Sequence, residues 1–340
     1  MRVITDLSKF DRSKFPDIVV ALGNFDGVHQ AHRKLLELVK SRSEALYGIA
    51  SVLTFKEHPQ RVLHKKEDPP ILTSYEHKLH LLRECGIQLC FVIDFSIEFA
   101  RLSAEDFVSK VLVDMLGAKE ICLGFNARFG HDRTGDSCLM KSLAEKERIG
   151  FLEAPPIRIG REVVSSTLIR KMILAGDFEQ AQKMLGRPYS FFGQAVQGHG
   201  RGRRLGFPTI NLDVHSEVLP PQGVYAVWAE VVRCQFTELR EGVQEFSSGT
   251  TKRKLKAVMN YGVRPTFEND SLPIPEIHFL DAYSHEDGKN LFEITFGRWL
   301  RSEKRFENEA ALKRQIEHDI QSADDWFEHE KSKGGVNLCR

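Results

Sequence analysis

The first half of the chain alternates short, β-branched apolar runs with segments of helical periodicity, and this order constrains the fold more than any other feature. The apolar runs lie at 18–22, 49–55, 89–95 and 120–124, with helical patterns between them at 32–46, 75–85 and 104–116. Strands that are apolar throughout are buried on both faces of a sheet. The alternation therefore predicts an α/β, Rossmann-like domain with a parallel sheet, whose ligands bind beyond the carboxyl ends of the strands.

The pattern changes near residue 186. Two consecutive helices, each ending at a Gly, are predicted at about 166–185, followed by a linker at 186–189. Beyond the linker, strand-like segments follow one another without helices, at 224–232, 256–262, 276–283 and 291–297. This order predicts an antiparallel β-barrel, and an amphipathic terminal helix is predicted at about 308–329. We therefore expect two domains, 1–186 and 187–340.

Composition excludes several classes of protein. Hydrophobic residues make up 41% and charged residues 28%, as in an ordinary soluble globular chain. The 48 Lys and Arg against 47 Asp and Glu leave a net charge of +1, so nucleic acid is not a predicted partner. No stretch approaches the ~18 apolar residues that span a bilayer, and the start of the chain does not read as a signal peptide. We expect a cytoplasmic protein without membrane association.

The six cysteines form no C-x-x-C pair and no zinc-ligand spacing, so we expect reduced thiols that serve mainly in packing. The polar and basic segment 247–256 is predicted to form a solvated hairpin tip. A nucleic-acid patch at this segment is the alternative.

The first motif with chemical content is GNFDGVHQAH at 23–32, directly after the predicted strand 18–22. Gly23 and Gly27 permit tight turns and a close approach of backbone to a ligand. His29 and His32 are three residues apart at a helix start, so they lie near one face. Their ring N–H groups, the free backbone amides and the helix dipole suit phosphate. The alternative is a chance H-x-x-H with solvated or capping rings, and zinc lacks a third ligand.

The second motif is VVSSTLIRKMI at 163–173. Ser165 or Ser166 is a good N-cap, and Arg170 falls one helical turn inside. An amide-rich helix start together with Arg170 can hold the β- and γ-phosphates of ATP. The alternative is an ordinary capped helix with a surface Arg.

The second half contains no G-x-x-x-x-G-K-[ST], so a kinase here is not a P-loop enzyme. Instead, GHGRGRRLGFPTINL at 198–212 joins a Gly- and Arg-rich loop to an apolar turn. Its glycines expose backbone amides that can wrap phosphates, and Thr209 and Asn211 offer neutral oxygens for Mg²⁺. A flexible basic loop leading into a strand is the alternative.

These motifs resemble those of a known family. GNFDGVHQAH and SSTLIR look like the two signatures of the nucleotidyltransferase superfamily with an H-x-G-H motif, while TFKEHP (54–59) and GFNARFGHDRTGD (124–136) resemble the FMN adenylyltransferase module of bifunctional bacterial riboflavin kinase/FAD synthetases. GHGRGRRLGFPTINL resembles the riboflavin kinase signature. GVYAV, VMNYGVRPTF, EIHFL and LRSEKRF then follow in the family's order. The resemblance covers about 15–325.

The resemblance implies a role for individual residues. The ATP site of the adenylyltransferase would comprise Gly23, Asn24, Phe25, Asp26, His29, His32, Asn126, Ser165, Ser166, Thr167 and Arg170. The ATP site of the kinase would comprise Gly198, Gly202, Gly206, Pro208, Thr209 and Asn211, with Thr209 and Asn211 also on Mg²⁺. Flavin contacts would come from Phe55, His58, Pro59, Phe129 and Arg301. Core packing is the alternative for Phe55 and Phe129, and a surface ion pair is the alternative for Arg301.

The implied function has two steps. The C-terminal domain transfers the γ-phosphate of ATP to riboflavin, with Glu276 as the base, and gives FMN. The N-terminal domain adenylylates FMN with a second ATP and gives FAD and pyrophosphate, with His29 and His32 as catalytic residues. The implied ligands are riboflavin, ATP, Mg²⁺ and the products FMN and FAD. A monomer or weak homo-oligomer is expected.

Three positions depart from the family's pattern. Ala31 replaces the usual Gly, Ile71 replaces an Arg, and Ala127 replaces a common Phe. They motivate one alternative, a riboflavin kinase with a degraded N-terminal site. Two further alternatives are a flavin-binding module or regulator without turnover, which is from a different class, and a cytidylyltransferase that acts on another phosphate ester.

Overall fold

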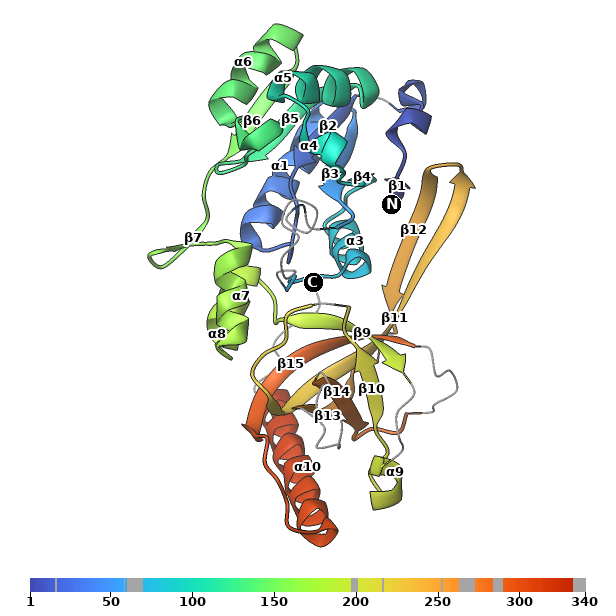
Figure 1. Ribbon diagram of the computed structural model, residues 1–340, viewed down its shortest axis with the longest axis vertical. Helices are drawn as coiled ribbons and strands as arrows, with labels where there is room; N and C mark the ends of the chain where they lie inside the picture. The colour runs from blue at the N-terminus through green and yellow to red at the C-terminus, as the bar shows by residue number, and fades with distance from the viewer. Residues whose placement is uncertain are drawn as a thin grey trace. The chain divides into compact units, whose positions relative to one another are not determined.

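A computed structural model describes residues 1–15, 17–57, 59, 70–196, 201–215, 217–251, 253–262, 273–283 and 290–332. The chain divides into two compact units (Figure 1). The first comprises Met1–Ile169 with Cys234–Ser248, and the second comprises Arg170–Arg233 with Gly249–Arg340.

The first unit is built on a parallel sheet. Its strands lie in the order β1 (Arg2–Ile4), β4 (Leu89–Ile93), β3 (Ile49–Phe55), β2 (Ile18–Leu22), β5 (Ala118–Gly124) and β6 (Gly150–Ala154). Every neighbouring pair in this series is parallel. The predicted Rossmann-like α/β sheet is confirmed, and β1 and β6 are strands that the periodicity did not predict.

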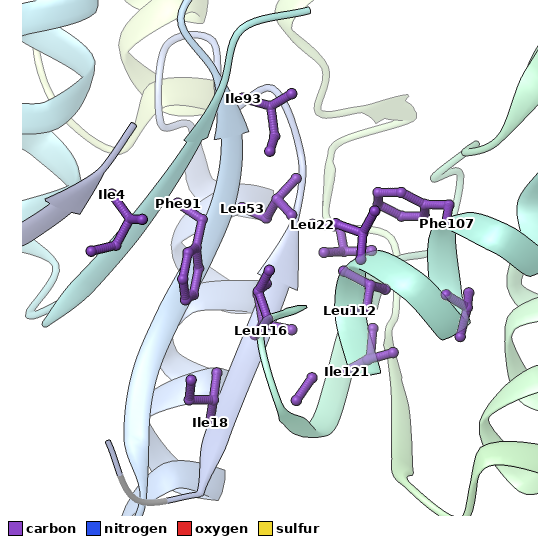
Figure 2. Close-up of a cluster of buried hydrophobic side chains, with 14 of the residues drawn as sticks. Ile4, Ile18, Leu22, Leu53, Phe91, Ile93, Phe107, Leu112, Leu116 and Ile121 are labelled. Carbon is purple, nitrogen blue, oxygen red and sulfur yellow. The ribbon is translucent and has the colours of Figure 1, made fainter. Parts of the chain in front are cut away.

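Helices cover both faces of this sheet because β2 is apolar on both sides. Val19 and Ala21 pack with α1 (Gln30–Ala45) and α3 (Tyr75–Glu84). Ile18, Val20 and Leu22 pack with the opposite layer, which contains η3 (Phe107–Met115) and α6 (Ser137–Glu147). Figure 2 shows this second cluster, with Phe107 and Leu112 beside the strand residues.

The predicted helix 104–116 has an unexpected geometry. It begins as α5 (Ala104–Asp106) and continues as η3, a π-helix with wider turns. The backbone N–H of Leu116 accordingly donates to the oxygen of Val111, five residues earlier, at 3.0 Å. Apolar spacing predicts that a segment is helical, and it does not distinguish an α-turn from a π-turn.

Short elements complete the first unit. They are η1 (Leu7–Lys9), η2 (Arg12–Lys14), α4 (Ile97–Ala100), η4 (His131–Arg133), β7 (Arg158–Ile159) and β8 (Glu162–Val163). The next helix, α7 (Ser166–Leu174), starts in the first unit and ends in the second.

The second unit contains a closed antiparallel barrel, as predicted. The strand order is β13 (Leu255–Gly262), β14 (Ile274–Phe279), β10 (Ile210–Asp213), β9 (Ser190–Val196), β15 (Leu291–Ser302) and β11 (Gly223–Arg240). β13 pairs with both β14 and β11, and this closes the barrel. The unit also contains α8 (Phe178–Leu185) and α9 (Arg201–Leu205).

The predicted terminal helix is α10 (Glu309–Ser332), which packs on β13 and β15 (Figure 1). Phe327 of this helix is buried, and its ring centroid lies 4.5 Å from that of Trp228 on β11. This packing fixes the helix to the outside of the barrel.

A hairpin from the second half of the sequence forms part of the first unit. β11 extends to Arg240, well beyond the predicted end at 232, and turns at Glu241–Gly242 into β12 (Val243–Thr250). β12 then pairs antiparallel with β1, with Val3 opposite Gln244. The hairpin tip predicted at 247–256 is therefore misplaced, because the turn lies at Glu241–Gly242 and residues 247–250 belong to β12, which lies between β11 and β1. The predicted exposure holds for Ser247, Gly249 and Thr251.

Aromatic packing explains why this hairpin adheres to the first unit. Phe246 is fully buried, and its ring lies 4.9 Å from Phe236, which in turn stacks on Tyr75 of α3 at 6.2 Å. The guanidinium of Arg83 donates to the backbone oxygen of Ser248 at 2.8 Å. The hairpin thus covers the otherwise unpaired edge of β1, which would be a site for wrong strand pairing if exposed.

We predict that Phe246→Ala destabilises the first unit by about 3–5 kcal/mol, because it removes a buried aromatic ring and leaves a cavity. Thermal unfolding should show a lowered transition, and amide hydrogen exchange should rise in β1. Leu239→Ala is the matched control, since Leu239 lies on the same hairpin and is 51% exposed. Equal exchange of β1 in both variants would contradict the assignment of this hairpin.

Candidate active sites

The loop after β2 forms the centre of the first candidate site. The N–H of Gly23 donates to Leu53 on β3 at 3.1 Å, which continues the sheet to its carboxyl edge. Gly27 has a φ of +81°, and a Cβ there would lie 2.7 Å from Leu72. Phe25 is buried and also has a positive φ, 53°. A non-glycine residue in this conformation is strained, a feature that often accompanies binding loops.

Asp26 is buried in this loop and accepts hydrogen bonds from a distant segment. Its Oδ1 accepts the backbone N–H groups of Leu72 at 2.8 Å and Thr73 at 3.1 Å. The Thr73 hydroxyl oxygen in turn accepts the N–H of Gly27 at 3.0 Å. Asp26 therefore holds the segment that carries Ile71 against the loop, and its predicted role at ATP stays a prediction.

The two histidines lie together, as their spacing predicts. His29 is the N-cap of α1, with its Nδ1 accepting the N–H of His32 at 3.3 Å, and the two rings stack with centroids 3.6 Å apart. Burial lowers the pKa of His32 well below its usual value, and the nearby charges of His29 and Lys78 lower it further. His32 is thus neutral at pH 7. His29 therefore caps the helix, as the alternative interpretation expected, and both rings lie at the start of α1.

The second motif meets the first. The Ser165 hydroxyl accepts the N–H of Leu168 at 3.3 Å and so caps α7. The Ser166 hydroxyl donates to the backbone oxygen of Asp26 at 2.9 Å, across 140 residues of sequence. Arg170 lies on the same helix four residues after Ser166, which places both on one face. The start of α7 is therefore fixed beside the histidine loop.

The remaining predicted residues of the first site differ in exposure, since some are exposed and others pack against neighbouring rings. Asn126 is exposed in the turn after β5, and Thr167 is exposed at the start of α7. Phe55 packs edge-on against Phe95 at 5.3 Å, and Phe129 lies 6.0 Å from Phe107. Both rings thus pack against other aromatic side chains, which was the alternative to a flavin contact for them.

Two of the predicted flavin residues follow Phe55 in the sequence. Pro59 is half-buried. His58 lies outside the described residues.

The second candidate site begins with a loop that is folded tightly on itself. The N–H of Phe207 donates to the oxygen of Gly202 at 2.8 Å. A Cβ at Gly202 would lie 2.9 Å from Oγ1 of Thr209, and Gly206 has a φ of +91°. Glycine is therefore required at both positions. The oxygen of Pro208 lies 2.9 Å from Nδ1 of His278, whereas Gly198 lies outside the described residues.

Asn211 and Glu276 are brought together by strand register. Asn211 on β10 is directly opposite Glu276 on β14, and Glu276 is also opposite Asn260 on β13. Residues opposite one another in an antiparallel pair share a face of the sheet. The proposed base is therefore flanked by two amides, of which the sequence analysis identified one. Asn260 falls within the quoted VMNYGVRPTF segment, and the strand pairing that places it was not visible in the sequence.

Arg301 forms an ion pair, which was the alternative to its predicted contact with the flavin. Its Nε lies 2.9 Å from Oδ1 of Asp319 and its Nη2 2.7 Å from Oδ2 of the same buried carboxylate on α10. Its Nη1 donates to the oxygen of Ser302 at 2.9 Å. This arrangement gives Arg301 a structural task, and its flavin role stays a prediction.

The comparisons agree with this geometry. Residues 11–168 match the family described as FAD synthetase, and residues 185–327 match the one described as riboflavin kinase. A relative from Escherichia coli (strain K12), named bifunctional riboflavin kinase/FMN adenylyltransferase, is 30% identical over 96% of this chain and 98% of its own. The chain belongs to this bifunctional family.

Other members of the family show the same relation. The Haemophilus influenzae relative of that name is 31% identical over 91% of this chain and 94% of its own, and the Bacillus subtilis relative is 30% identical over 91% and 92%. A crystal structure described as a macrolide-efflux protein from Streptococcus pneumoniae matches with a TM-score of 0.77 and 25% identity, covering 95% of this chain and 98% of that one. Family and fold therefore extend over both units.

Two findings concern groups that the described residues do not form. No cluster of three or more His, Cys, Asp or Glu side chains suited to a metal ion occurs in them. Within the same part of the chain, no helix has both the length and the apolar character needed to cross a membrane.

The sequence analysis missed Lys78. This residue lies on α3, is 5% exposed, and its Nζ donates to the backbone oxygen of Phe55 at 2.6 Å. It shares the buried stripe of Tyr75, Leu79 and Leu82 at helical spacing. A lysine at an apolar position of a predicted amphipathic helix was the signal that could have identified it.

We predict that Asp26→Ala destabilises the first unit by about 1–3 kcal/mol, because the amides of Leu72 and Thr73 lose a buried acceptor. Asp11→Ala is the matched control, since Asp11 accepts the N–H of Ser13 at 3.2 Å at an exposed site. The control should stay within about 0.5 kcal/mol of the parent protein. Chemical denaturation of the two variants measures the difference, and equal losses would contradict the structural task of Asp26.

Proposed function

We propose that this chain performs both steps of FAD synthesis, phosphorylating riboflavin to FMN and adenylylating FMN to FAD. Membership of the bifunctional family supports both activities. The observation that carries the adenylyltransferase half is the hydrogen bond from Ser166 to Asp26, which joins two phosphate-binding segments that lie far apart in sequence. This hydrogen bond keeps the two segments side by side, as a working adenylyltransferase site requires.

In the kinase step, Glu276 takes the proton of the ribityl 5′-hydroxyl as that oxygen attacks the γ-phosphorus of ATP. The bond from the γ-phosphorus to the bridging oxygen breaks, and ADP leaves. Backbone amides of the loop with Gly198, Gly202 and Gly206 contact the phosphates, and Pro208, which has no N–H, follows them in the same segment.

Mg²⁺ fits the oxygen donors of the kinase site. Thr209 and Asn211 would hold it through neutral oxygens, with phosphate and water completing its shell. The absence of a carboxylate cluster among the described residues suits a metal that arrives with the nucleotide. When bound, the ion neutralises charge on the phosphates.

In the adenylyl transfer, a phosphate oxygen of FMN attacks the α-phosphorus of ATP, and the bond to the β-phosphate breaks to release pyrophosphate. His29 and His32 donate ring N–H groups to the triphosphate, and a neutral His32 does so without an unpaired buried charge. Arg170 and the start of α7 hold the β- and γ-phosphates.

Further nucleotide and flavin contacts complete our proposal. Gly23, Asn24, Phe25, Asp26, Asn126, Ser165, Ser166 and Thr167 surround the nucleotide. We assign flavin contacts in the adenylyl transfer to Phe55, His58, Pro59 and Phe129, and a flavin contact in the kinase step to Arg301.

The setting of the enzyme follows from the same proposal. We place the adenylyltransferase in 1–186 and the kinase in 187–340, in a cytoplasmic monomer or weak homo-oligomer. Its partners are riboflavin, FMN and ATP, with no nucleic acid or membrane. The described cysteines, which are free thiols, support a reducing compartment.

Product analysis tests this function. The pure protein is incubated with riboflavin, ATP and Mg²⁺, and the flavins are separated by chromatography. FMN followed by FAD supports both sites. FMN alone would mean that Ala31, Ile71 or Ala127 has cost the first unit its chemistry, and no product from folded protein would favour the flavin-binding module.

Two single substitutions should separate the steps. Glu276→Ala should slow FMN formation by about 10²- to 10⁴-fold, the usual contribution of a general base, and spare FAD formation from supplied FMN. His29→Ala should slow FAD formation by about 10²- to 10³-fold, as for loss of a charge-stabilising donor, and spare FMN formation. Each variant serves as the control for the other. Loss of both activities in one folded variant would contradict the two-site model.

A further inference from the structure

We propose that Lys78 is a phosphate-binding residue of the adenylyltransferase site, whose ammonium contacts the triphosphate of ATP beside His29 and His32. This inference rests on the proposed function and adds a residue that neither the motifs nor the comparisons assign. It begins from the position of one buried cation on α3.

The first step is the reach of the side chain. Lys78 projects from α3, and its Nζ lies 2.6 Å from the backbone oxygen of Phe55, the last residue of β3. β3 is the neighbour of β2 in the parallel sheet. The ammonium group therefore lies at the carboxyl edge of the strands, the edge from which the histidine loop emerges.

The second step is electrostatic proximity. The positive charge of Lys78 lowers the pKa of His32, and the negative charge of Asp26 raises that of Lys78. Each residue comes from a different segment, namely α1, α3 and the loop after β2. The three groups therefore lie within electrostatic range of one another, and the burial of Lys78 and Asp26 strengthens the interaction of their charges.

The third step is that this ammonium has no ion-pair partner, because the Asp26 carboxylate acts on it only through space. Lys78 forms no ion pair with a carboxylate among the residues that the structure describes, and its hydrogen bond goes to a neutral carbonyl. A buried ammonium that no carboxylate contacts directly costs free energy. An ammonium has three donors, so two remain for a ligand. The anion that this site is built to receive is a nucleotide phosphate.

The chemistry of the transfer gives this charge a use. When the bond between the α- and β-phosphates breaks, negative charge grows on the departing pyrophosphate. A preorganised ammonium in a buried site stabilises that charge without reorganising solvent. Lys78 would thus act on the leaving group, and the two histidines would donate hydrogen bonds to the same oxygens.

Burial lowers the pKa of Lys78 to about 8, against a usual value of 10.5. The free enzyme therefore loses this charge as the pH rises above 8, and affinity for a phosphate anion should fall. Two other groups near the ammonium do not change charge there, because burial holds the pKa of His32 well below 6.5 and raises that of the Cys90 thiol on β4 to about 12. The Asp26 carboxylate is common to all variants and cancels in their comparison.

The test compares Lys78→Met, Lys78→Arg and the parent protein in the full chain. The probes are inorganic pyrophosphate and ATP, titrated calorimetrically between pH 7 and 10 at constant salt. We expect Lys78→Met to bind about 10- to 100-fold more weakly at pH 7, as for loss of a charge-assisted hydrogen bond. The Met variant should stay weak and report only the titration of the probe itself. Relative to it, the parent's affinity should fall up to about tenfold per pH unit above 8.

Lys78→Arg keeps its charge over the whole range, so it should bind more tightly than the Met variant and show no fall above pH 8. Lys34→Met is the matched control, because Lys34 lies on α1 near His32 with its side chain 59% exposed. This control should bind both probes as the parent does. Kinase activity in the same chain, from riboflavin to FMN, should stay unchanged in every variant.

A purely structural role for Lys78 would give a different result. A lysine that only ties α3 to Phe55 would lower thermal stability on substitution and leave the pH profile of pyrophosphate binding intact. If the folded Met variant kept the parent's affinity, or kept its fall above pH 8, the proposal would be overturned. A parent protein that makes no FAD would instead defeat the proposed function, so the two failures are distinguishable.

Discussion

One buried residue, Asp26, ties together the three segments on which the first site depends. Its carboxylate accepts the amides of residues 72 and 73, while its own backbone oxygen accepts the hydroxyl of Ser166. The loop after β2, the segment before α3 and the start of α7 are thereby fixed at one edge of the parallel sheet. The histidines, the α7 amides and Lys78 come from these same elements or their continuations.

In the second unit, the register of the barrel strands brings the candidate site residues together. The register of β10 against β14 sets Asn211 opposite Glu276, and that of β13 sets Asn260 on the other side. No side chain has to reach far, because closure of the barrel brings these strands together. The tightly folded glycine loop then enters β10 directly, so this loop, Asn211 and Glu276 lie on adjoining strands of the barrel.

The elements that local pattern specifies were predictable from the sequence. β2 and β3 lie at the predicted residues, and α8 ends at Gly186 in the left-handed conformation as its glycine indicates. The meeting of GNFDGVHQAH with SSTLIR was expected only through family resemblance, since no local rule joins residues so far apart.

Three features were beyond sequence reasoning for physical reasons. The π-turns of η3 share the apolar spacing of an α-helix, so the sequence predicts only a helix there. The burial of Lys78 was not predicted because lysine is a residue type that is usually exposed. The hairpin tip was predicted at 247–256 because that segment is polar and basic, whereas the turn lies at Glu241–Gly242 and the residues that anchor the hairpin, Phe236 and Phe246, lie within its strands. Residue type alone does not predict whether a side chain is buried when a distant part of the chain packs against it.

That hairpin also orders events during synthesis. The first unit is assembled from Met1–Ile169 and Cys234–Ser248, so its sheet lacks an edge strand while the ribosome is still translating the barrel. Domains commonly fold one after another as they emerge, beginning at the N-terminus. Here the nascent first domain must wait, with β1 unpaired on one side, until residue 248 has left the exit tunnel. A pause or a chaperone binding site in that interval has a structural reason in this chain.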